Sequence, residues 1–346
     1  MASVSNSAPS TSTATRIVVA GCGYWGKNLV RNFYALGALA GVIDPSAAGR
    51  DLARALAPGT PVFENLETAL AVGGFSGVAI ATPAVTHFET ASRAFAAGLD
   101  VFVEKPIALH VEDAVQLVEN AARLGRILQV GHILEYHPAL PVLSEWVESG
   151  RLGNLRRLQA HRTNWGMIRT EEDALWSVAP HDIAVMLRLI GRLPETVAAH
   201  GTHILGTSRA DAVVARLMFS DGVEGHLLAS WHHPVKEQRI MIVGDRGMVL
   251  FDDLSPDRKL CFYEEYVRWQ DGKPELIKSP AQPAALSSEE PLRRECQAFL
   301  EAMATRVPPL ADGRSGLHVL CVLDACRRSM QQGGAPVPCL AKPLLA

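Results

Sequence analysis

A glycine-rich turn near the N-terminus constrains the fold of this chain more than any other feature. The β-branched segment 16–20 predicts a strand, Gly21-Cys22-Gly23-Tyr24-Trp25-Gly26 follows it, and residues 27–36 carry apolar side chains at helical spacing. G-x-G-x-x-G between a strand and a helix is typical of dinucleotide sites: the first glycine turns the chain, the second admits a pyrophosphate, and the third lets helix and strand pack. We expect these residues, including Tyr24 and Trp25, to contact the cofactor; the alternative is a purely structural turn.

An acidic residue indicates which dinucleotide binds. The predicted strand 39–43 ends at Asp44, close to the position, about 20 residues downstream of the glycines, where an acid binds the ribose hydroxyls of NAD. Its carboxylate would repel the 2′-phosphate of NADP, and Pro45 and Ser46 supply no adjacent arginine to hold one. The sequence therefore favours NAD over NADP. The alternative is that Asp44 is a turn residue before Pro45.

Strand and helix patterns alternate along the first half of the chain. We expect helices at 48–56, 66–72, 88–97 and 111–124, and strands at 62–63, 77–81, 100–103 and 127–130. Such alternation predicts a parallel, doubly wound sheet. The loop that contains Thr82 and Pro83 leaves a strand end and should border the nicotinamide half of the cofactor. His87 is a candidate for the same site or simply the start of a helix.

A lysine at the end of a buried strand is the main candidate for chemistry. The apolar strand 100–103 leads into Glu104-Lys105-Pro106. Desolvation near the core would lower the pKa of Lys105 towards the range where it exchanges protons, and Pro106 stiffens its position. Ligands of open α/β sheets bind at the carboxyl ends of strands. The alternative is a surface lysine paired with Glu104.

Composition limits the classes of partner. The 346 residues suggest two domains, and a net charge of −3 without a basic run argues against nucleic acid and anionic membranes as partners. We find no apolar stretch long enough to span a membrane. Six scattered cysteines without CxxC spacing predict reduced thiols in a cytoplasmic protein. Residues 1–14 are predicted to be a disordered tail rather than a signal peptide.

Three motifs together resemble one oxidoreductase family. GCGYWG, ATPAVTHFE and VFVEKPIA, each after a predicted strand, are similar to the motifs of the Gfo/Idh/MocA family of NAD(P)-dependent oxidoreductases, and the resemblance extends from Arg16 to about Pro338. It implies an α/β architecture, with an N-terminal Rossmann domain (15–132) and a C-terminal α+β domain (133–346). The latter is built on a large, open, mostly antiparallel sheet that commonly forms the interface of a homodimer or homotetramer. The last helix is a candidate to pack back on the Rossmann domain.

The resemblance also assigns site residues. Lys105 would be the catalytic lysine, with Glu104 as its motif neighbour and a Lys-Pro bond that is often cis in the family. A histidine ten residues before a glycine completes the family site, and His181 and Gly191 fit this spacing. Many members carry an Asp four residues before this histidine. Here that position is Ser177, which argues mildly against the cyclitol type of site, and Asp182 is a candidate substitute.

The second half of the chain predicts a sheet with closing helices. Expected strands cover 155–163, 196–200, 212–219, 223–231, 239–243, 248–251 and 259–263, and expected helices cover 140–150, 183–190, 289–305 and 316–330. Trp231, His232 and His233 are read as the end of one strand. Because neighbouring side chains on a strand point to opposite faces, we expect no metal site at His232 and His233.

The expected reaction is reversible hydride transfer between NAD and a secondary alcohol of a sugar. Lys105 would take the hydroxyl proton and His181 would hold or relay it. The strings GYWGKNLVRNF, GHILEYHPA and LWSVAPHDIAVML resemble the nucleotide-sugar branch, which includes UDP-N-acetylglucosaminuronic acid 3-dehydrogenases and implies oxidation at C3 of a UDP-linked amino sugar or its uronic acid. Besides Lys105 and His181, the candidate substrate residues are Tyr136, Arg162, Asn164, Arg169, Trp176 and Asp182.

Several alternatives stay open at this point. His132, Glu135, Tyr136 and His137 are candidates to line a cleft or only to pack at a hinge, and the arginines are candidates for surface ion pairs. The enzyme could instead oxidise a free sugar or cyclitol. A non-catalytic NAD-binding regulator is a third possibility, against which the presence of both Lys105 and His181 argues.

Overall fold

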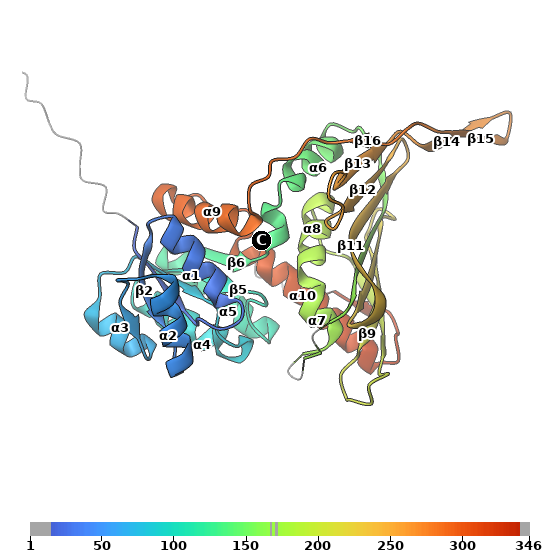
Figure 1. Ribbon diagram of the computed structural model, residues 1–346. Coiled ribbons are helices and arrows are strands. Elements are labelled where there is room, and N and C mark those ends of the chain that lie inside the picture. The colour runs from blue at the N-terminus through green and yellow to red at the C-terminus, as the bar shows by residue number, and fades with distance from the viewer. Residues whose placement is uncertain (1–14, 167, 170–171, 340–346) are drawn as a thin grey trace, which may run out of the picture.

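Two sheets with helices between them form the core of the protein (Figure 1). The computed structural model describes residues 15–166, 168–169 and 172–339. The predicted disordered tail, residues 1–14, lies outside the described part of the chain.

The first sheet has six parallel strands in the order β3-β2-β1-β4-β5-β6. Its strands are β1 (Ile17–Ala20), β2 (Leu39–Ile43), β3 (Val62–Phe63), β4 (Gly77–Ile80), β5 (Asp100–Glu104) and β6 (Leu128–Gly131). All residues of β1, β4 and β5 are buried, as expected when helices cover both faces of a parallel sheet. The predicted doubly wound sheet is confirmed.

Helices cover this sheet on both faces. They are α1 (Gly26–Ala35), α2 (Ala47–Leu56), α3 (Leu66–Val72), α4 (His87–Ala96) and α5 (Val111–Leu124), and α9 (Pro291–Thr305) joins them from the far end of the chain. On the face of α1 and α9, the ring of Phe299 meets Phe33 and Phe102 edge to face, with ring centroids 6.5 and 5.8 Å away. The C-terminal segment thus completes the core of the N-terminal sheet.

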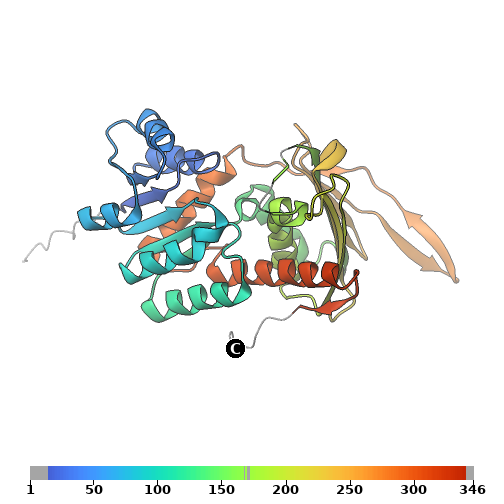
Figure 2. The ribbon, with the colours of Figure 1, turned by 90° about the horizontal axis from the view of Figure 1, so that it is seen from below.

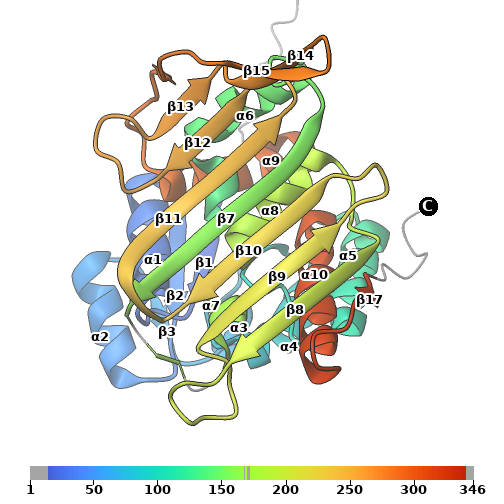
Figure 3. The same ribbon diagram turned by 90° about the vertical axis from the view of Figure 1, so that its right-hand side faces the viewer.

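The second sheet has nine strands in the order β16-β13-β12-β11-β7-β10-β9-β8-β17, seen face-on in Figure 3. Only the β7–β10 pair is parallel among its described strands, so the prediction of a mostly antiparallel sheet is confirmed. Its members are β7 (Leu155–Trp165), β8 (Thr196–Thr202), β9 (Ala212–Met218), β10 (Glu224–Ser230), β11 (His232–Gly244), β12 (Met248–Asp252), β13 (Leu260–Tyr263), β16 (Gln282–Pro283) and β17 (Val337–Pro338).

One face of the second sheet packs on helices. These are α6 (Ala139–Glu148), the short α7 (Ala174–Val178), α8 (Pro180–Ile190) and α10 (Gly313–Gln331). In β9 the alternate residues Val213, Ala215 and Leu217 are buried, whereas Val214 on the opposite face is 57% exposed. α10 packs on α5 and β6 of the first sheet and on α8 and β8, so it ties the two sheets together (Figure 2). None of the described helices has the length and apolar character needed to cross a membrane.

Some elements differ from the sequence-based expectation. His232 and His233 begin β11 rather than end the preceding strand, because β10 stops at Ser230 and Trp231 turns the chain. Their strand was hidden because its pairing with β7 is interrupted after His232 and resumes only at Glu237. The polar hairpin β14 (Tyr266–Gln270) and β15 (Lys273–Ile277), which projects from the sheet edge, was also missed (Figure 1).

Candidate active site

A cavity of about 690 Å³ lies where the carboxyl ends of β4 and β5 face β7, α7 and α8. The first half of the chain contributes Tyr24, Trp25, Ala81, Thr82, Pro83, Ala84, His87, Glu104, Lys105 and Pro106. The second half contributes Arg162, Thr163, Asn164, Arg169, Glu172, Ser177, Val178, His181 and Gln238. The fold therefore brings most of the predicted cofactor and substrate residues to one cavity.

The glycine-rich turn has the geometry that a dinucleotide requires. Gly21 has a φ of +95°, and a Cβ there would lie 2.6 Å from the Ala81 oxygen. A Cβ on Gly26 would overlap the carbonyl oxygen of Gly21, whereas one on Gly23 would meet nothing within 4 Å. The first turn of α1 carries no acidic residue and no side-chain cap. An open approach at Gly23 beside a helix N-terminus fits a pyrophosphate.

Asp44 is positioned as an ionised carboxylate at the end of β2. Burial disfavours its charge, but hydrogen bonds from Ser46 and Cys22 outweigh this and lower its pKa. The Cys22 N–H donates to Oδ2 at 2.8 Å, and the Ser46 hydroxyl donates to Oδ1 at 2.7 Å. One neighbour was not foreseen: the Arg50 guanidinium donates to the backbone oxygens of Asp44 and Pro45, at 2.9 and 2.8 Å.

His87 connects two cavity-lining loops. Its ring nitrogens lie 2.8 Å from the Pro106 carbonyl oxygen and 2.9 Å from that of Thr82, and the residue is 1% exposed. Burial lowers its pKa despite these two acceptors. His87 is the first residue of α4, and it also lines the cavity. The neutral ring carries one N–H, so it donates to only one of these two carbonyl oxygens, but both ring nitrogens face the backbone of the loops.

Lys105 lies at the centre of the cavity wall. Its ammonium group donates to the Ser177 carbonyl oxygen at 2.7 Å, and the Lys105–Pro106 bond is cis, as the family resemblance implied. Burial lowers the pKa of Lys105, as expected for a lysine at a strand end. The Glu104 carboxylate accepts from the indole N–H of Trp25 at 2.5 Å and from the backbone N–H of Lys105 at 3.3 Å. Burial raises the pKa of Glu104 to about 7.

His181 stands opposite Lys105 in the first turn of α8. Burial, followed by the nearby Lys105, lowers its pKa well below the usual value, so the ring is neutral. Its Nδ1 is buried and has no hydrogen-bond partner among the described residues. The ring of His132 approaches edge to face, with centroids 6.0 Å apart. His132, from the GHILEYHPA string, therefore packs against the site.

The two predicted substrate arginines are already paired. Arg162 forms a bidentate pair with Asp182, at 2.6 and 2.8 Å, and the Asp182 side chain is 1% exposed. Arg169 lies 3.2 Å from Glu172 and donates to the Ser177 hydroxyl at 3.1 Å. Asp182 therefore neutralises Arg162 and does not replace an acid at position 177. Asn164 lies in the cavity on the same face of β7 as Arg162.

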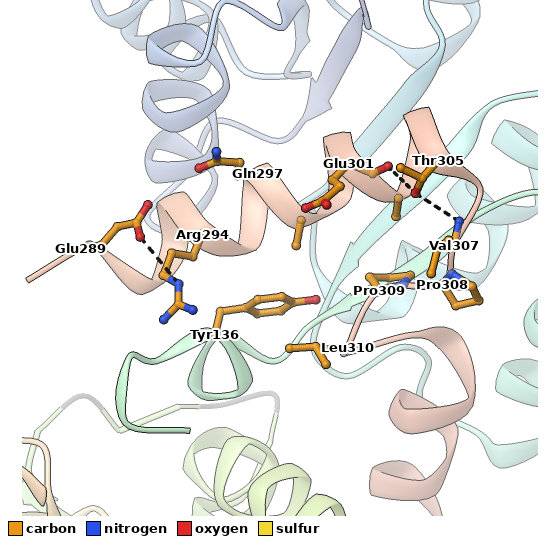
Figure 4. Close-up of a pocket in the computed structure, with 12 residues that line it drawn as sticks. Tyr136, Glu289, Arg294, Gln297, Glu301, Thr305, Val307, Pro308, Pro309 and Leu310 are labelled. Carbon is orange, nitrogen blue, oxygen red and sulfur yellow. Dashed lines mark hydrogen bonds and ion pairs between the residues drawn. The ribbon is translucent and has the colours of Figure 1, made fainter. Parts of the chain in front are cut away.

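Three predicted substrate residues do not line this cavity: Asp182, which is buried against Arg162, and also Trp176 and Tyr136. Trp176 lines a neighbouring cavity, although Ser177 beside it faces Lys105. Tyr136 lies in a third cavity against α9 (Figure 4), where its hydroxyl accepts from the Ala311 N–H at 3.2 Å. Conversely, Gln238 lines the active-site cavity without having been predicted; it is paired with Arg162 across β11 and β7, a proximity that residue type alone does not signal.

Metal binding has no support from the side chains that are described. No group of three or more His, Cys, Asp or Glu among them is arranged to hold an ion, and none of the six cysteines is bridged.

Comparison with known proteins identifies the family. Residues 15–132 match the oxidoreductase family with an NAD-binding Rossmann fold, and residues 142–250 match the Gfo/Idh/MocA C-terminal domain. The chain belongs to the Gfo/Idh/MocA family. As a member it is an NAD-dependent dehydrogenase, and the glycine turn and Asp44 described above fit this cofactor.

Several relatives align over most of the chain. A UDP-N-acetylglucosamine 3-dehydrogenase of Acidithiobacillus ferrooxidans is 29% identical over 88% of this chain and 94% of its own. Its crystal structure superposes with a TM-score of 0.80 at 28% identity, covering 92% and 97% of the two chains. An inositol 2-dehydrogenase of Saccharopolyspora erythraea is 27% identical over 95% and 99%. The WlbA dehydrogenase of Bordetella pertussis, in complex with NADH and UDP-GlcNAcA, shares the fold at 22% identity and a TM-score of 0.78, over 95% and 99% of the chains.

Proposed function

We propose that this dehydrogenase oxidises the C3 hydroxyl of a UDP-linked N-acetylamino sugar. The observation that carries the proposal is Lys105, a desolvated lysine at the carboxyl end of β5 in a cavity that also holds His181. The substrate class is supported by the relative from A. ferrooxidans, which aligns over nearly its whole length.

In the proposed reaction, a side chain of the protein accepts the proton of the substrate hydroxyl. Burial lowers the pKa of Lys105, which makes its neutral form more accessible, and in that form the amine accepts the proton of the C3 hydroxyl. Its bond to the Ser177 carbonyl fixes the direction of the amine. NAD, when bound, supplies the hydride acceptor. The Rossmann half therefore provides both the cofactor site and the base.

His181 is proposed to hold the reacting hydroxyl against Lys105. Its imidazole is neutral, so one ring nitrogen donates and the other accepts. Nδ1 is buried and unpaired among the described residues, so we assign the contact with the substrate hydroxyl to Nε2. The edge of His132 restricts rotation of the ring.

The charges in the cavity favour a neutral sugar over its uronic acid. A substrate carboxylate needs a free cation, but Arg162 is neutralised by Asp182 and Arg169 by Glu172. Lys105 cannot be the cation that binds a carboxylate, because the proposed mechanism requires its amine to be uncharged. Breaking a buried pair to release an arginine is costly. We therefore favour UDP-N-acetylglucosamine over UDP-N-acetylglucosaminuronic acid.

The test is NADH formation from NAD with UDP-N-acetylglucosamine, its uronic acid, free N-acetylglucosamine and myo-inositol. We expect UDP-N-acetylglucosamine, whose sugar carries no carboxylate, to give the highest kcat/KM. Turnover of inositol alone would overturn the proposal in favour of a cyclitol dehydrogenase, which the second relative represents. Preference for the uronic acid would refute the charge argument but keep the substrate class.

We also propose that the protein is a cytoplasmic homo-oligomer that associates through the open face of the nine-stranded sheet. This face presents Val214, Met241 and Leu250, partly or largely exposed, opposite the helix-covered side (Figure 3). Light scattering should give a dimer or tetramer for the wild type, and Val214→Asp should dissociate it. A monomeric wild type would contradict this proposal. The unbridged cysteines are compatible with a reducing compartment.

A further inference from the structure

A second cavity, of about 650 Å³, adjoins the active-site cavity. The two share Pro83, Ala84 and Glu172 in their walls, so they are neighbouring compartments at the junction of the two halves of the protein. The second compartment is enclosed by the loop after β4, the start of α5, the β8–β9 loop and the C-terminal half of α10. Trp176, which the sequence indicated as a substrate residue, lines this compartment.

The walls of the second cavity combine apolar surface with cationic groups. Trp176, 8% exposed, and Met330 supply apolar surface, and Asp173 fixes the start of α7 by accepting from the Trp176 N–H at 3.0 Å. Arg209 and Arg327 supply positive charge. An aromatic plane beside arginines is the combination that binds a base and its phosphates.

Arg209 is the important cation. Its guanidinium makes no hydrogen bond or ion pair with any residue that the structure describes, although the side chain is half-buried. By contrast, Arg327 pairs with Asp324 at 2.5 Å. The acidic groups of the wall are engaged: Glu172 pairs with Arg169, and Asp173 caps α7. An anion in this cavity would therefore meet Arg209 without first displacing a described partner.

We propose that this second cavity binds the nucleotide half of the substrate, with the base against Trp176 and the diphosphate at Arg209. The inference rests on the proposed function, since only a nucleotide-linked sugar has such a half. The sugar must reach Lys105, so the group attached to its C1 needs space next to the active site. The cavity of Figure 4 cannot provide this space, because none of its lining residues also lines the active-site cavity.

The test measures binding of UDP to the NAD-loaded protein by calorimetry and turnover of UDP-N-acetylglucosamine. We expect Arg209→Met to raise the Kd of UDP roughly 10- to 150-fold, as for loss of one charge-assisted hydrogen bond, and to raise KM with little change in kcat. Trp176→Leu should also weaken UDP binding. Because Trp176 is largely buried, its variant is used only if its Tm matches the wild type. Arg294→Met, in the cavity of Figure 4, is the matched control and should bind UDP normally.

The outcomes separate this inference from the function on which it rests. If UDP-N-acetylglucosamine is oxidised but Arg209→Met binds UDP like the wild type, the site is wrong and the function stands. If the wild type neither binds UDP nor oxidises a UDP-sugar, both are wrong. A raised Kd and KM in Arg209→Met, with the Arg294→Met control unchanged, would support the site.

Discussion

Two glycines of the N-terminal turn allow a test that separates cofactor binding from folding. Both belong to the G-x-G-x-x-G motif, but a methyl group has opposite surroundings at the two positions. At Gly23 it meets nothing within 4 Å, whereas at Gly26 it overlaps the carbonyl oxygen of Gly21. Gly23→Ala should therefore leave the protein folded and occupy the space through which the pyrophosphate approaches the backbone.

The expected magnitudes follow from these contacts. Gly23→Ala should cost one charge-assisted hydrogen bond to phosphate, about 1.5–3 kcal/mol, and raise the Kd for NAD roughly 10- to 150-fold. Its Tm without NAD should match the wild type. Gly26→Ala should cost stability by overpacking, about 1–3 kcal/mol or more, because the atom it meets is backbone and cannot rotate away.

The assay is calorimetric titration with NAD, together with thermal unfolding of the apoprotein. The two motif glycines serve as controls for each other, since the same methyl group is added at both positions. Wild-type affinity for NAD in Gly23→Ala would refute the reasoning, because the pyrophosphate would then not pass this position.

Three further predictions concern buried or cofactor-facing charges. Glu295 is fully buried and its pKa is strongly raised, so the folded state keeps a proton that the unfolded chain releases above about pH 4.5. The free energy of unfolding of the wild type should therefore fall by up to about 1.4 kcal/mol per pH unit above that pH. Glu295→Gln should raise Tm, and by more at pH 8 than at pH 6. Asp182→Asn leaves the Arg162 charge uncompensated and should cost about 3–5 kcal/mol in denaturant unfolding, whereas removing both charges should restore much of it. Asp44→Asn removes the charge that repels a 2′-phosphate and leaves Arg50 nearby, so the ratio of NADP to NAD affinity should rise about tenfold or more.

The first half of the fold was predictable because local patterns there agree with tertiary structure. Strands β1 and β4 are apolar throughout, and β5 is apolar between its terminal residues Asp100 and Glu104, as burial on both faces of a parallel sheet requires. The β14–β15 hairpin was missed because its strands are largely exposed and carry no buried stripe. Its Asp271-Gly272 turn, with both residues at positive φ, was the available signal.

Site residues were predictable where they directly follow the end of a strand. They were less predictable where the direction of a side chain on a helix decides which cavity it lines. Lys105 follows β5 directly, so sequence order placed it. Trp176 and Ser177 are adjacent in α7, but successive side chains of a helix point about 100° apart, so Trp176 lines the second cavity whereas the Ser177 hydroxyl meets Arg169 in the active-site cavity. The partner of Lys105 is a backbone carbonyl, which any residue type supplies. Tyr136 was misleading because an aromatic residue near a cleft is equally suited to packing.

The role of Lys105 as the base is the central claim, and the pH dependence of kcat/KM tests it most directly. Wild type and Lys105→Met should be compared with NAD and UDP-N-acetylglucosamine. Because only the neutral amine accepts a proton and burial lowers its pKa, wild-type activity should rise with pH and level off below the usual lysine pKa of about 10.4. In Lys105→Met, kcat should fall about 10²–10⁴-fold and the rise of activity with pH should disappear. The Tm of the variant should match the wild type. A variant that keeps the wild-type rate and pH profile would contradict the account.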